Sequence, residues 1–322
     1  MGTICAIMLA ENGHDVTLWS AFAAQAAETE AARENLRFLP GTKLPDGLRV
    51  TADDAEALAG ADLAISAVPT QFVRGVWQRL APHCPADLPI CSVTKGIENG
   101  TLLRPTQVLA DVLDAGEYRR ALAALSGPSI APEIAAGLPA TVAIASSDAD
   151  LAERVQTLIS RPYFRAYTNE DLVGVEIAGA TKNVVAIAAG VLDGMKAGDN
   201  AKAALVSRGL SEITRLGVAM DALAETFAGL AGVGDLVTTC ISPVGRNLSF
   251  GEAIGRGMTT NEAVAAAKGV VEGVATTESV VALAKRYKVD MPITRAVHDV
   301  LFGGVAPEEA IRGLMTRPLK AE

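Results

Sequence analysis

The feature that most constrains the fold of this 322-residue chain is a change of pattern near residue 169. Before that point, short apolar stretches that fit strands alternate with stretches that fit helices; after it, only helical patterns follow. Strands that are apolar throughout and separated by helices are typical of a mainly parallel sheet covered by helices. We therefore predict an α/β domain over residues 1–168 and an all-α domain over residues 169–322.

The individual elements follow from periodicity and from the turn residues between them. In the first domain, strands are predicted at residues 15–19, 48–51, 62–68, 88–94, 121–125, 140–145 and 164–168. Between them, helices are predicted at residues 53–58, 71–81, 106–113, 130–136 and 151–159. In the second domain, helices are predicted at residues 174–195, 202–216, 220–230, 261–267, 276–287, 292–301 and 307–314.

The N-terminus lacks a strand that this pattern requires. Residues 4–9 fit a helix that stops at Asn12-Gly13, and a strand follows at once. Helix, turn and strand form the second half of a βαβ unit, so a first strand and a glycine-rich turn are expected before residue 2. We expect a Rossmann-like parallel sheet whose first strand is missing, with Gly2 as the last glycine of a G-x-G-x-x-G turn. A start codon placed too far downstream and a genuine deletion both account for this start.

Composition restricts the partners and the compartment. A net charge of −9 and a pI of about 5.0 leave no basic patch, so no nucleic-acid partner is expected. Four cysteines without CxxC spacing predict neither a metal site nor disulfides; they fit a reducing cytoplasm, where they pack as small hydrophobes. No apolar run is expected to approach the roughly 20 residues that span a bilayer, and no signal peptide is recognised. We expect a soluble cytoplasmic protein.

Polar residues follow three strands of the predicted sheet. Residues 66–70 lead from one strand into a helix, Lys95 follows the next strand, and Gly127 and Ser129 follow the third. Ligands bind at the carboxyl ends of parallel strands, and the free N–H groups of helix starts favour anions. We therefore expect a ligand site at this edge, although a plain helix start or a solvated loop lysine would fit each stretch alone.

One apolar stretch of the helical half carries a charge. Residues 174–190 fit a buried helix that contains Lys182 and Asn183. A buried, unpaired charge is costly, so Lys182 either extends to water or has a purpose. The sequence alone leaves both interpretations open.

Two further stretches of the helical half could carry chemistry. A glycine-rich stretch at 229–240 holds Asp235, and it is also explained by a tight turn between helices that the acid caps. Arg246-Asn247 follows a loop of Pro and Gly, and a guanidinium offers phosphate a planar fork of donors.

Six ordered motifs carry a family resemblance. They are TKGIE at 94–98, SGPS at 126–129, GATKN at 179–183, GLAGVGD at 229–235, RN at 246–247 and VEGV at 271–274. The chain resembles the bacterial NAD(P)-dependent glycerol-3-phosphate dehydrogenases from residue 2 to about residue 302. The resemblance implies an N-terminal Rossmann domain that binds NAD or NADP and a helical domain that completes the substrate site. It further implies interconversion of sn-glycerol 3-phosphate and dihydroxyacetone phosphate, which supplies the glycerol backbone of phospholipids.

The resemblance also implies roles for individual residues. Lys182 matches the catalytic lysine, which protonates the carbonyl oxygen during reduction and accepts the hydroxyl proton during oxidation. The positions that match substrate contacts are Lys95, Gly127, Ser129, Lys182, Asn183, Asp235, Thr239, Gly245, Arg246 and Asn247. The positions that match cofactor contacts are Gly2, Phe38, Lys95, Ala131, Arg246, Val270 and Glu272. We expect the two lysines to lower each other's pKa and Asp235 to oppose that change.

The chain departs from the family pattern at three places. The first strand and the first two glycines are absent, which would expose two strand edges and weaken cofactor binding. Residues 20–22, Ser-Ala-Phe, hold neither an arginine for a 2′-phosphate nor an acid for the ribose, so the preference between NAD and NADP stays open. Gly245 stands where a serine commonly binds substrate, a loss that backbone N–H groups can cover.

Two other functions stay open at this point. A truncated paralogue would bind a phosphorylated metabolite without turnover, and another lysine-dependent dehydrogenase would act on a hydroxyacid. Arg246-Asn247 and the second lysine, Lys95, argue against the hydroxyacid. The alanine-rich helices of the second half are compatible with a homodimer.

Overall fold

A computed structural model describes residues 1–114, 120–267 and 269–318. The chain divides into two compact units. The first comprises Met1–Thr94 and Pro105–Val175, and the second comprises Lys95–Arg104 and Glu176–Glu322. The chain therefore passes from one unit to the other three times.

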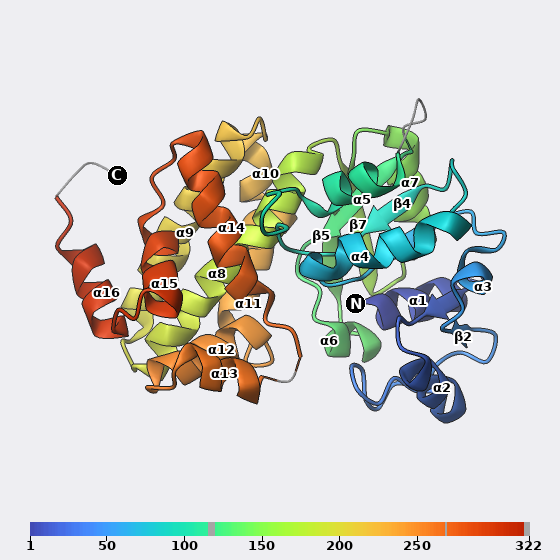
Figure 1. The fold of residues 1–322 in the computed structure, drawn as a ribbon, viewed down its shortest axis with the longest axis horizontal. Helices are drawn as coiled ribbons and strands as arrows, with labels where there is room; N and C mark the ends of the chain where they lie inside the picture. The colour runs from blue at the N-terminus through green and yellow to red at the C-terminus, as the bar shows by residue number, and fades with distance from the viewer. Residues whose placement is uncertain (115–119, 268, 319–322) are drawn as a thin grey trace. The chain divides into compact units, whose positions relative to one another are not determined.

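Among its described residues, the first unit contains seven strands. Helices lie between many of these strands along the chain (Figure 1). Its strands are β1 Thr17–Trp19, β2 Arg49–Thr51, β3 Ala64–Ser66, β4 Ile90–Ser92, β5 Leu122–Ser126, β6 Ala140–Ser146 and β7 Phe164–Asn169. Its helices are α1 Gly2–Glu11, α2 Ala23–Ala32, α3 Asp54–Leu58, α4 Thr70–Leu80, α5 Pro105–Leu113, α6 Ala131–Ala135 and α7 Ala149–Ile159. A single 3₁₀ turn, Ala81–His83, follows α4.

Every predicted strand is present in the first unit, whereas one helix of that unit, α2, was not predicted. In the second unit, α11 (Asp235–Ile241) and α12 (Arg246–Gly255) were not predicted either. Helix α2 has the sequence AAQAAETEAA and buries only Ala26 and Thr29. It lacks an apolar stripe, so periodicity gave no sign of it.

The strands form two sheets among the described residues. β1 pairs with β2, and the second sheet has the order β3-β4-β5-β6-β7. Every pairing is parallel except that of β5 with β6, which is antiparallel. This confirms the prediction of a mainly parallel sheet. Because β3, β4 and β5 are parallel, the residues that follow them emerge at the same edge.

The core of the first unit lies between helices and the central strands. Helix α1 contacts β1 and β3, and α7 packs against β5, β6 and β7. The buried side chains at this contact include Ile7, Leu125, Ile144, Val155 and Ile159. Burying an aliphatic side chain of this size contributes roughly 1.5–3 kcal/mol, so the packing of α1 and α7 holds the strands in register.

The cysteines behave as small hydrophobes. All four are free; Cys5, Cys91 and Cys240 are buried, and Cys84 is half-buried. Burial raises the pKa of the Cys5 thiol to about 11 and that of the Cys240 thiol to about 12. The thiols therefore stay neutral near pH 7, as expected of core cysteines.

The second unit is helical among its described residues (Figure 1). Its helices are α8 Leu172–Gly194, α9 Asp199–Ala219, α10 Ala224–Ala228, α11 Asp235–Ile241, α12 Arg246–Gly255, α13 Thr260–Ala266, α14 Glu272–Tyr287, α15 Pro292–Phe302 and α16 Pro307–Met315. One π-helical turn, Leu230–Gly234, leads directly into α11. The first turn of α8, up to Val175, clusters with the first unit.

The predicted helix at residues 220–230 is wrong. Helix α9 continues to Ala219, and Asp221 then adopts a left-handed φ of +67°, which ends the helix. Helix α10 starts only at Ala224, and the stretch predicted as a glycine-rich turn becomes the π-helical turn and α11. Asp235 is therefore the first residue of a helix.

The division into units also differs from the predicted boundary at residue 168. The second unit starts at Glu176, inside α8, and the first turn of that helix belongs to the first unit. The segment Lys95–Arg104 belongs to the second unit, because it hydrogen-bonds to α8 and α14.

Helix α8 is the core helix of the second unit. It has 23 residues, and its most apolar 18-residue window has a mean hydropathy of 1.5 and is 83% buried. The expectation that no apolar run approaches the length of a membrane span is therefore wrong on length alone. The burial accounts for the composition, because a helix packed on all sides needs no polar face.

Glycines bring α8 and α12 into backbone contact. A Cβ atom added to Gly190 of α8 would lie 2.0 Å from the carbonyl oxygen of Leu248. Likewise, a Cβ atom added to Gly251 of α12 would lie 2.1 Å from the carbonyl oxygen of Ile187. Only glycine permits this approach, and the contact holds α12 beside the middle of α8.

Candidate active site

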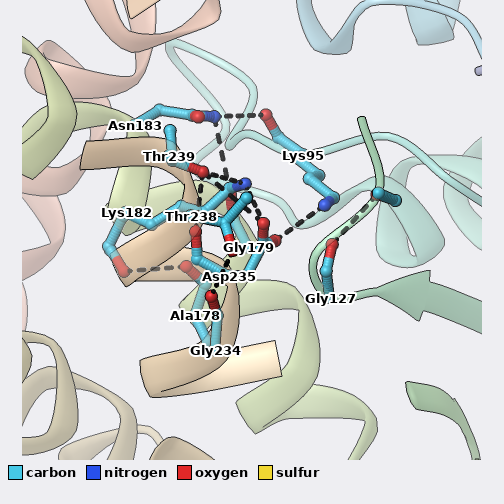
Figure 2. Close-up of polar contacts among 12 residues, drawn as sticks. Lys95, Gly127, Ala178, Gly179, Lys182, Asn183, Gly234, Asp235, Thr238 and Thr239 are labelled. Atoms are coloured by element: carbon cyan, nitrogen blue, oxygen red, sulfur yellow. Dashed lines mark hydrogen bonds and ion pairs between the residues drawn. The ribbon is translucent and has the colours of Figure 1, made fainter. Parts of the chain in front are cut away.

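Lys182, Asp235 and Lys95 form a buried charge cluster in the second unit (Figure 2). The Lys182 ammonium donates to Asp235 Oδ1, and the Lys95 ammonium donates to Asp235 Oδ2 at 2.7 Å. The side chain of Asp235 is 2% exposed, that of Lys182 8% and that of Lys95 17%. Lys182 therefore does not extend to water, which excludes the first of the two interpretations that the sequence left open.

Three separate elements supply this cluster. Lys182 lies in the middle of α8, Asp235 is the first residue of α11, and Lys95 lies in the segment that follows β4. The π-helical turn before Asp235 is a local departure from α geometry of the kind often found at functional sites.

Thr239 is the second hydrogen-bond acceptor of the Lys182 ammonium. Its Oγ1 accepts from Lys182 Nζ at 2.7 Å and donates to the backbone carbonyl of Asp235 at 2.7 Å. An ammonium has three N–H groups, and within the described part of the chain Asp235 and Thr239 take two of them. The third is available to an oxygen of a ligand.

The environment tunes the acidity of Lys182. Burial lowers the pKa of Lys182 to about 8; the charge of Asp235 opposes this change and the charge of Lys95 adds to it. Burial alone would raise the pKa of Asp235, but the attraction of the two ammonium groups outweighs it and holds that pKa below its usual value. The expected effects of Lys95 and Asp235 are thus present, but burial, which the sequence did not reveal, is larger than either.

A chain of amide hydrogen bonds ties the cluster to two more helices. Asn183 Nδ2 donates to the carbonyl oxygen of Lys95 at 3.2 Å, and Asn247 Nδ2 donates to Asn183 Oδ1 at 2.9 Å. Asn247 Oδ1 in turn accepts from the backbone N–H of Gly273 at 3.0 Å. Both asparagines are buried, so they fix α12 and α14 relative to Lys95.

The start of α12 offers groups suited to an anion. Arg246 is its first residue and is exposed, and its Nη1 donates to the carbonyl oxygen of Val270 at 2.7 Å. No side chain caps this helix, and no acid lies in its first turn. The N–H of Gly245 donates to the carbonyl oxygen of Ser242 at 3.0 Å, so the donors that could replace a serine there are those of the first turn of α12. Glu272 is the first residue of α14.

The remaining predicted site residues lie in the first unit. Gly127 follows β5 with a φ of +135°, and Ser129 Oγ donates to its carbonyl oxygen at 2.9 Å. Ala131 is the first residue of α6, and Phe38 is 56% exposed beside the guanidinium of Arg37.

The first unit has features that fit a dinucleotide. A Cβ atom added to Gly2, the first residue of α1, would lie 3.0 Å from Cβ of Ala67, immediately after β3. Helix α4 starts at Thr70, also just after β3. Neither helix has an acid in its first turn or a side-chain cap, so their backbone N–H groups suit a diphosphate.

An arginine that the sequence did not point to reaches the segment after β1. Arg79 Nη1 donates to the carbonyl oxygen of Ala21 at 3.1 Å. Arg79 is also bidentate to Asp54, at 2.6 and 2.8 Å, so its charge is already paired.

Glu176 is a further residue that the sequence analysis did not single out. It lies in the same apolar helix as Lys182, is buried, and forms an ion pair with the buried Arg104. An acid within an apolar run was a visible signal, but its partner is 72 residues away and could not be identified.

Comparisons with known proteins agree along the whole chain. Residues 1–152 match the family model described as NAD-dependent glycerol-3-phosphate dehydrogenase N-terminus, and residues 171–312 match the model of its C-terminus. An NAD(P)+-dependent glycerol-3-phosphate dehydrogenase of Geobacter sp. (strain M21) is 48% identical over 321 residues, which cover 100% of this chain and 96% of the relative. The corresponding enzyme of Streptomyces avermitilis is 46% identical, with coverage of 100% and 95%.

A solved structure supports the same assignment. The crystal structure of glycerol-3-phosphate dehydrogenase from Coxiella burnetii is 37% identical, with a TM-score of 0.93. The match covers 98% of this chain and 95% of that one.

Proposed function

The chain belongs to the NAD-dependent glycerol-3-phosphate dehydrogenase family, and from this premise we propose that Lys182 is the acid and base with which it interconverts sn-glycerol 3-phosphate and dihydroxyacetone phosphate. The protein is an oxidoreductase that uses NAD or NADP. The observation that carries the proposal is the buried ammonium of Lys182, with a pKa of about 8 and one N–H left for a ligand.

Lys182 provides the proton that the reduction needs. A nicotinamide cofactor, when bound, would supply the hydride for reduction and accept it in oxidation. As the carbonyl carbon is reduced, negative charge develops on its oxygen, and the Lys182 ammonium stabilises that charge and transfers a proton to it. In the opposite direction, neutral Lys182 accepts the hydroxyl proton. A pKa of about 8 lets the same group serve in both directions near neutral pH.

Asp235 and Lys95 keep the site stable through this proton transfer. When Lys182 becomes neutral, Asp235 still faces the Lys95 ammonium at 2.7 Å. The buried carboxylate therefore never lacks a countercharge, which would be costly in this environment. Lys95 consequently supports the proton transfer even where it does not itself move a proton.

The phosphate of the substrate suits the start of α12. Arg246 and the uncapped first turn of that helix offer charge and N–H donors to a dianion, while Asn247 is the next residue. Binding energy at the phosphate orients the carbonyl for reaction at Lys182. Gly245, Asn183 and Thr239 are assigned to the same substrate.

The cofactor and remaining assignments follow the family pattern. We assign the dinucleotide to residues 1–168, where Gly2, Ala131 and Phe38 are its contacts, and the substrate domain to residues 169–322. Gly127 and Ser129 are assigned to the substrate, and Val270, Glu272, Lys95 and Arg246 to the cofactor. The product feeds glycerophospholipid synthesis in the cytoplasm, and the protein acts as a homodimer without a nucleic-acid partner.

The test is the oxidation of NADH or NADPH that depends on dihydroxyacetone phosphate. We expect Lys182→Met to lower kcat by roughly 10²- to 10⁴-fold, the usual contribution of a general acid. The variant should fold, because Asp235 keeps Lys95 as its partner. The control is Lys202→Met, because Lys202 forms a partly buried pair with Asp193 at 2.6 Å and is not assigned to the proposed site.

Three results would contradict the proposal. Equal losses in the two variants would remove Lys182 from the chemistry. Turnover of 2-oxo acids in place of dihydroxyacetone phosphate would indicate a hydroxyacid dehydrogenase. A folded protein that binds dihydroxyacetone phosphate without oxidising either cofactor would indicate a non-catalytic paralogue.

A further inference from the structure

The segment Lys95–Arg104, here called the 95–104 loop, belongs to the second unit although the chain on either side of it belongs to the first. It carries Lys95, one of the two cations that face Asp235. The position of the Lys95 ammonium therefore depends on what holds this loop to the second unit.

Both ends of the loop are fixed to the same face of α8. At one end, Asn183 Nδ2 donates to the carbonyl oxygen of Lys95 at 3.2 Å. At the other end, the guanidinium of Arg104 forms an ion pair with Glu176. Glu176 and Asn183 are seven residues apart, about two turns of helix, so their side chains point the same way.

The middle of the loop is fixed to α14. Ser279 Oγ lies 3.0 Å from the carbonyl oxygen of Ile97, and Ile97 itself is fully buried. Asn99 Nδ2 donates to the carboxylate of Glu278 at 3.0 Å.

The loop is also braced internally. The N–H of Glu98 donates to the carbonyl oxygen of Leu103 at 3.0 Å, and the N–H of Leu102 donates to that of Glu98 at 3.0 Å. These bonds join the two arms of the loop, so a displacement at Arg104 is passed through Leu103 and Glu98 toward Lys95.

We propose that Glu176 is a positioning residue: its buried ion pair with Arg104 fixes the 95–104 loop on α8 and thereby holds Lys95 against Asp235. This inference rests on the proposed function of Lys182 and Lys95. A buried ion pair is a poor source of net stability, because desolvating two charges offsets their attraction. Its contribution here is geometric, since a bonded guanidinium and carboxylate define both distance and orientation.

The groups that face Lys182 determine how a displacement of Lys95 would change the pKa of Lys182. These are Asp235 and Cys240 of α11 and Lys95 of the loop, and the Cys240 thiol is neutral near pH 7 because burial raises its pKa to about 12. If Lys95 leaves Asp235, Lys182 loses a repelling neighbour and shares the carboxylate with no other cation. Both changes raise the pKa of Lys182.

The experiment is a double-mutant cycle of Glu176→Gln and Lys95→Met in the full chain. We measure kcat, KM for dihydroxyacetone phosphate and the pH dependence of its reduction. In the pH profile, kcat/KM should fall at high pH as Lys182 loses its proton; this fall is called the alkaline limb. Glu176→Gln should lower kcat/KM by about 10-fold and move the alkaline limb to a pH that is roughly 1 unit higher. Lys95→Met should lower kcat/KM by about 100-fold, and the double variant should match Lys95→Met to within about 2-fold, because coupled residues are not additive.

The control is Asp114→Asn, an equally conservative neutralisation of a buried ion pair. Asp114 pairs with Arg120 at 3.0 Å in the first unit, where the side chains are 12% and 2% exposed. We expect it to lower thermal stability without moving the alkaline limb. If Glu176→Gln does not fold, Glu176→Asp, which keeps the charge but shortens the reach, takes its place in the same cycle.

The outcomes separate the two proposals. Absence of dihydroxyacetone phosphate reduction in the unsubstituted chain would overturn the proposed function itself. Wild-type kcat/KM in Lys95→Met would instead overturn the role of Lys95 and with it the positioning role of Glu176. Glu176 would act independently of Lys95 if Lys95→Met lowers kcat/KM as expected and the double variant lowers it by about a further 10-fold. An alkaline limb that stays in place in Glu176→Gln would likewise overturn the positioning role.

Discussion

In the first unit the groups offered to a ligand belong mainly to the backbone, whereas in the second unit they belong to charged side chains. Helix α4 starts just after β3, and the first residue of α1, Gly2, lies close to Ala67, immediately after β3. Neither helix has a side-chain cap or an acid in its first turn. The second unit instead holds two ammonium groups on one carboxylate in a buried site.

This difference predicts which property of the protein a substitution in each unit should change. Backbone donors survive most side-chain changes and are lost only when the chain path is disturbed. The charge cluster depends on individual atoms, so a single neutralisation changes the protonation of its neighbours. We therefore expect substitutions in the second unit to alter the chemistry and those in the first to alter stability and binding.

The largest effect is expected from Asp235→Asn. It leaves the buried Lys182 and the partly buried Lys95 without their shared anion, so the pKa of Lys182 falls further. We expect kcat to drop by roughly 10³-fold and about 3–5 kcal/mol of stability to be lost. Steady-state rates measure the loss of activity, and urea unfolding measures the loss of stability. The control is Asp193→Asn: Asp193 pairs with Lys202 and its side chain is 29% exposed, so this change should leave kcat unchanged.

Acid unfolding tests the pairing of Asp235 with the two ammonium groups. Its pKa is lowered in the folded protein, so the stability it contributes is present above the unfolded value of about 3.9 and is lost as pH falls through the folded value. Asp235→Asn should therefore lose less stability than the wild type below about pH 4. An equal loss in both proteins would contradict the pairing.

A smaller effect is expected from Arg246→Met. Loss of a charged hydrogen-bond donor should lower kcat/KM for dihydroxyacetone phosphate by about 10- to 100-fold. The control is Arg256→Met, at the other end of α12, where an exposed pair with Glu252 at 3.2 Å contributes little. If the two variants behave alike, the phosphate does not bind at the start of α12.

The smallest effect on chemistry is expected from Gly127→Ala in the first unit. With φ at +135° and a new Cβ 2.9 Å from Cα of Val142, the variant should lose about 1–3 kcal/mol of stability. Its KM values should rise while the alkaline limb stays in place. Gly75→Ala in α4, where the added Cβ meets nothing within 4 Å, serves as the control and should be neutral or stabilised by about 0.5–1 kcal/mol. A shifted limb in Gly127→Ala would break the proposed contrast between the units.

The sequence was sufficient for elements whose pattern is strong. Buried strands such as β4 and β5 stand out because they are apolar throughout, and turn residues bound them. It failed where no apolar stripe exists, as in α2, and where a helix ends through a left-handed residue such as Asp221, which periodicity does not reveal.

For the site, the sequence supplied residues but not their environment. The family resemblance alone assigns Lys182, Asp235 and Lys95 to one substrate site. The burial that dominates the pKa of Lys182 depends on α8 being enclosed on all sides, which is a property of tertiary packing. The pair of Glu176 with Arg104 joins residues 72 positions apart and likewise emerges only from the fold.

The most direct test of the account is the pH dependence of the wild-type enzyme in both directions. If Lys182 donates the proton in reduction and accepts it in oxidation, kcat/KM for dihydroxyacetone phosphate should fall as pH rises through about 8. Over the same range, kcat/KM for sn-glycerol 3-phosphate should rise. Limbs that run in the same direction, or that persist in Lys182→Met, would contradict the assignment of the proton to Lys182.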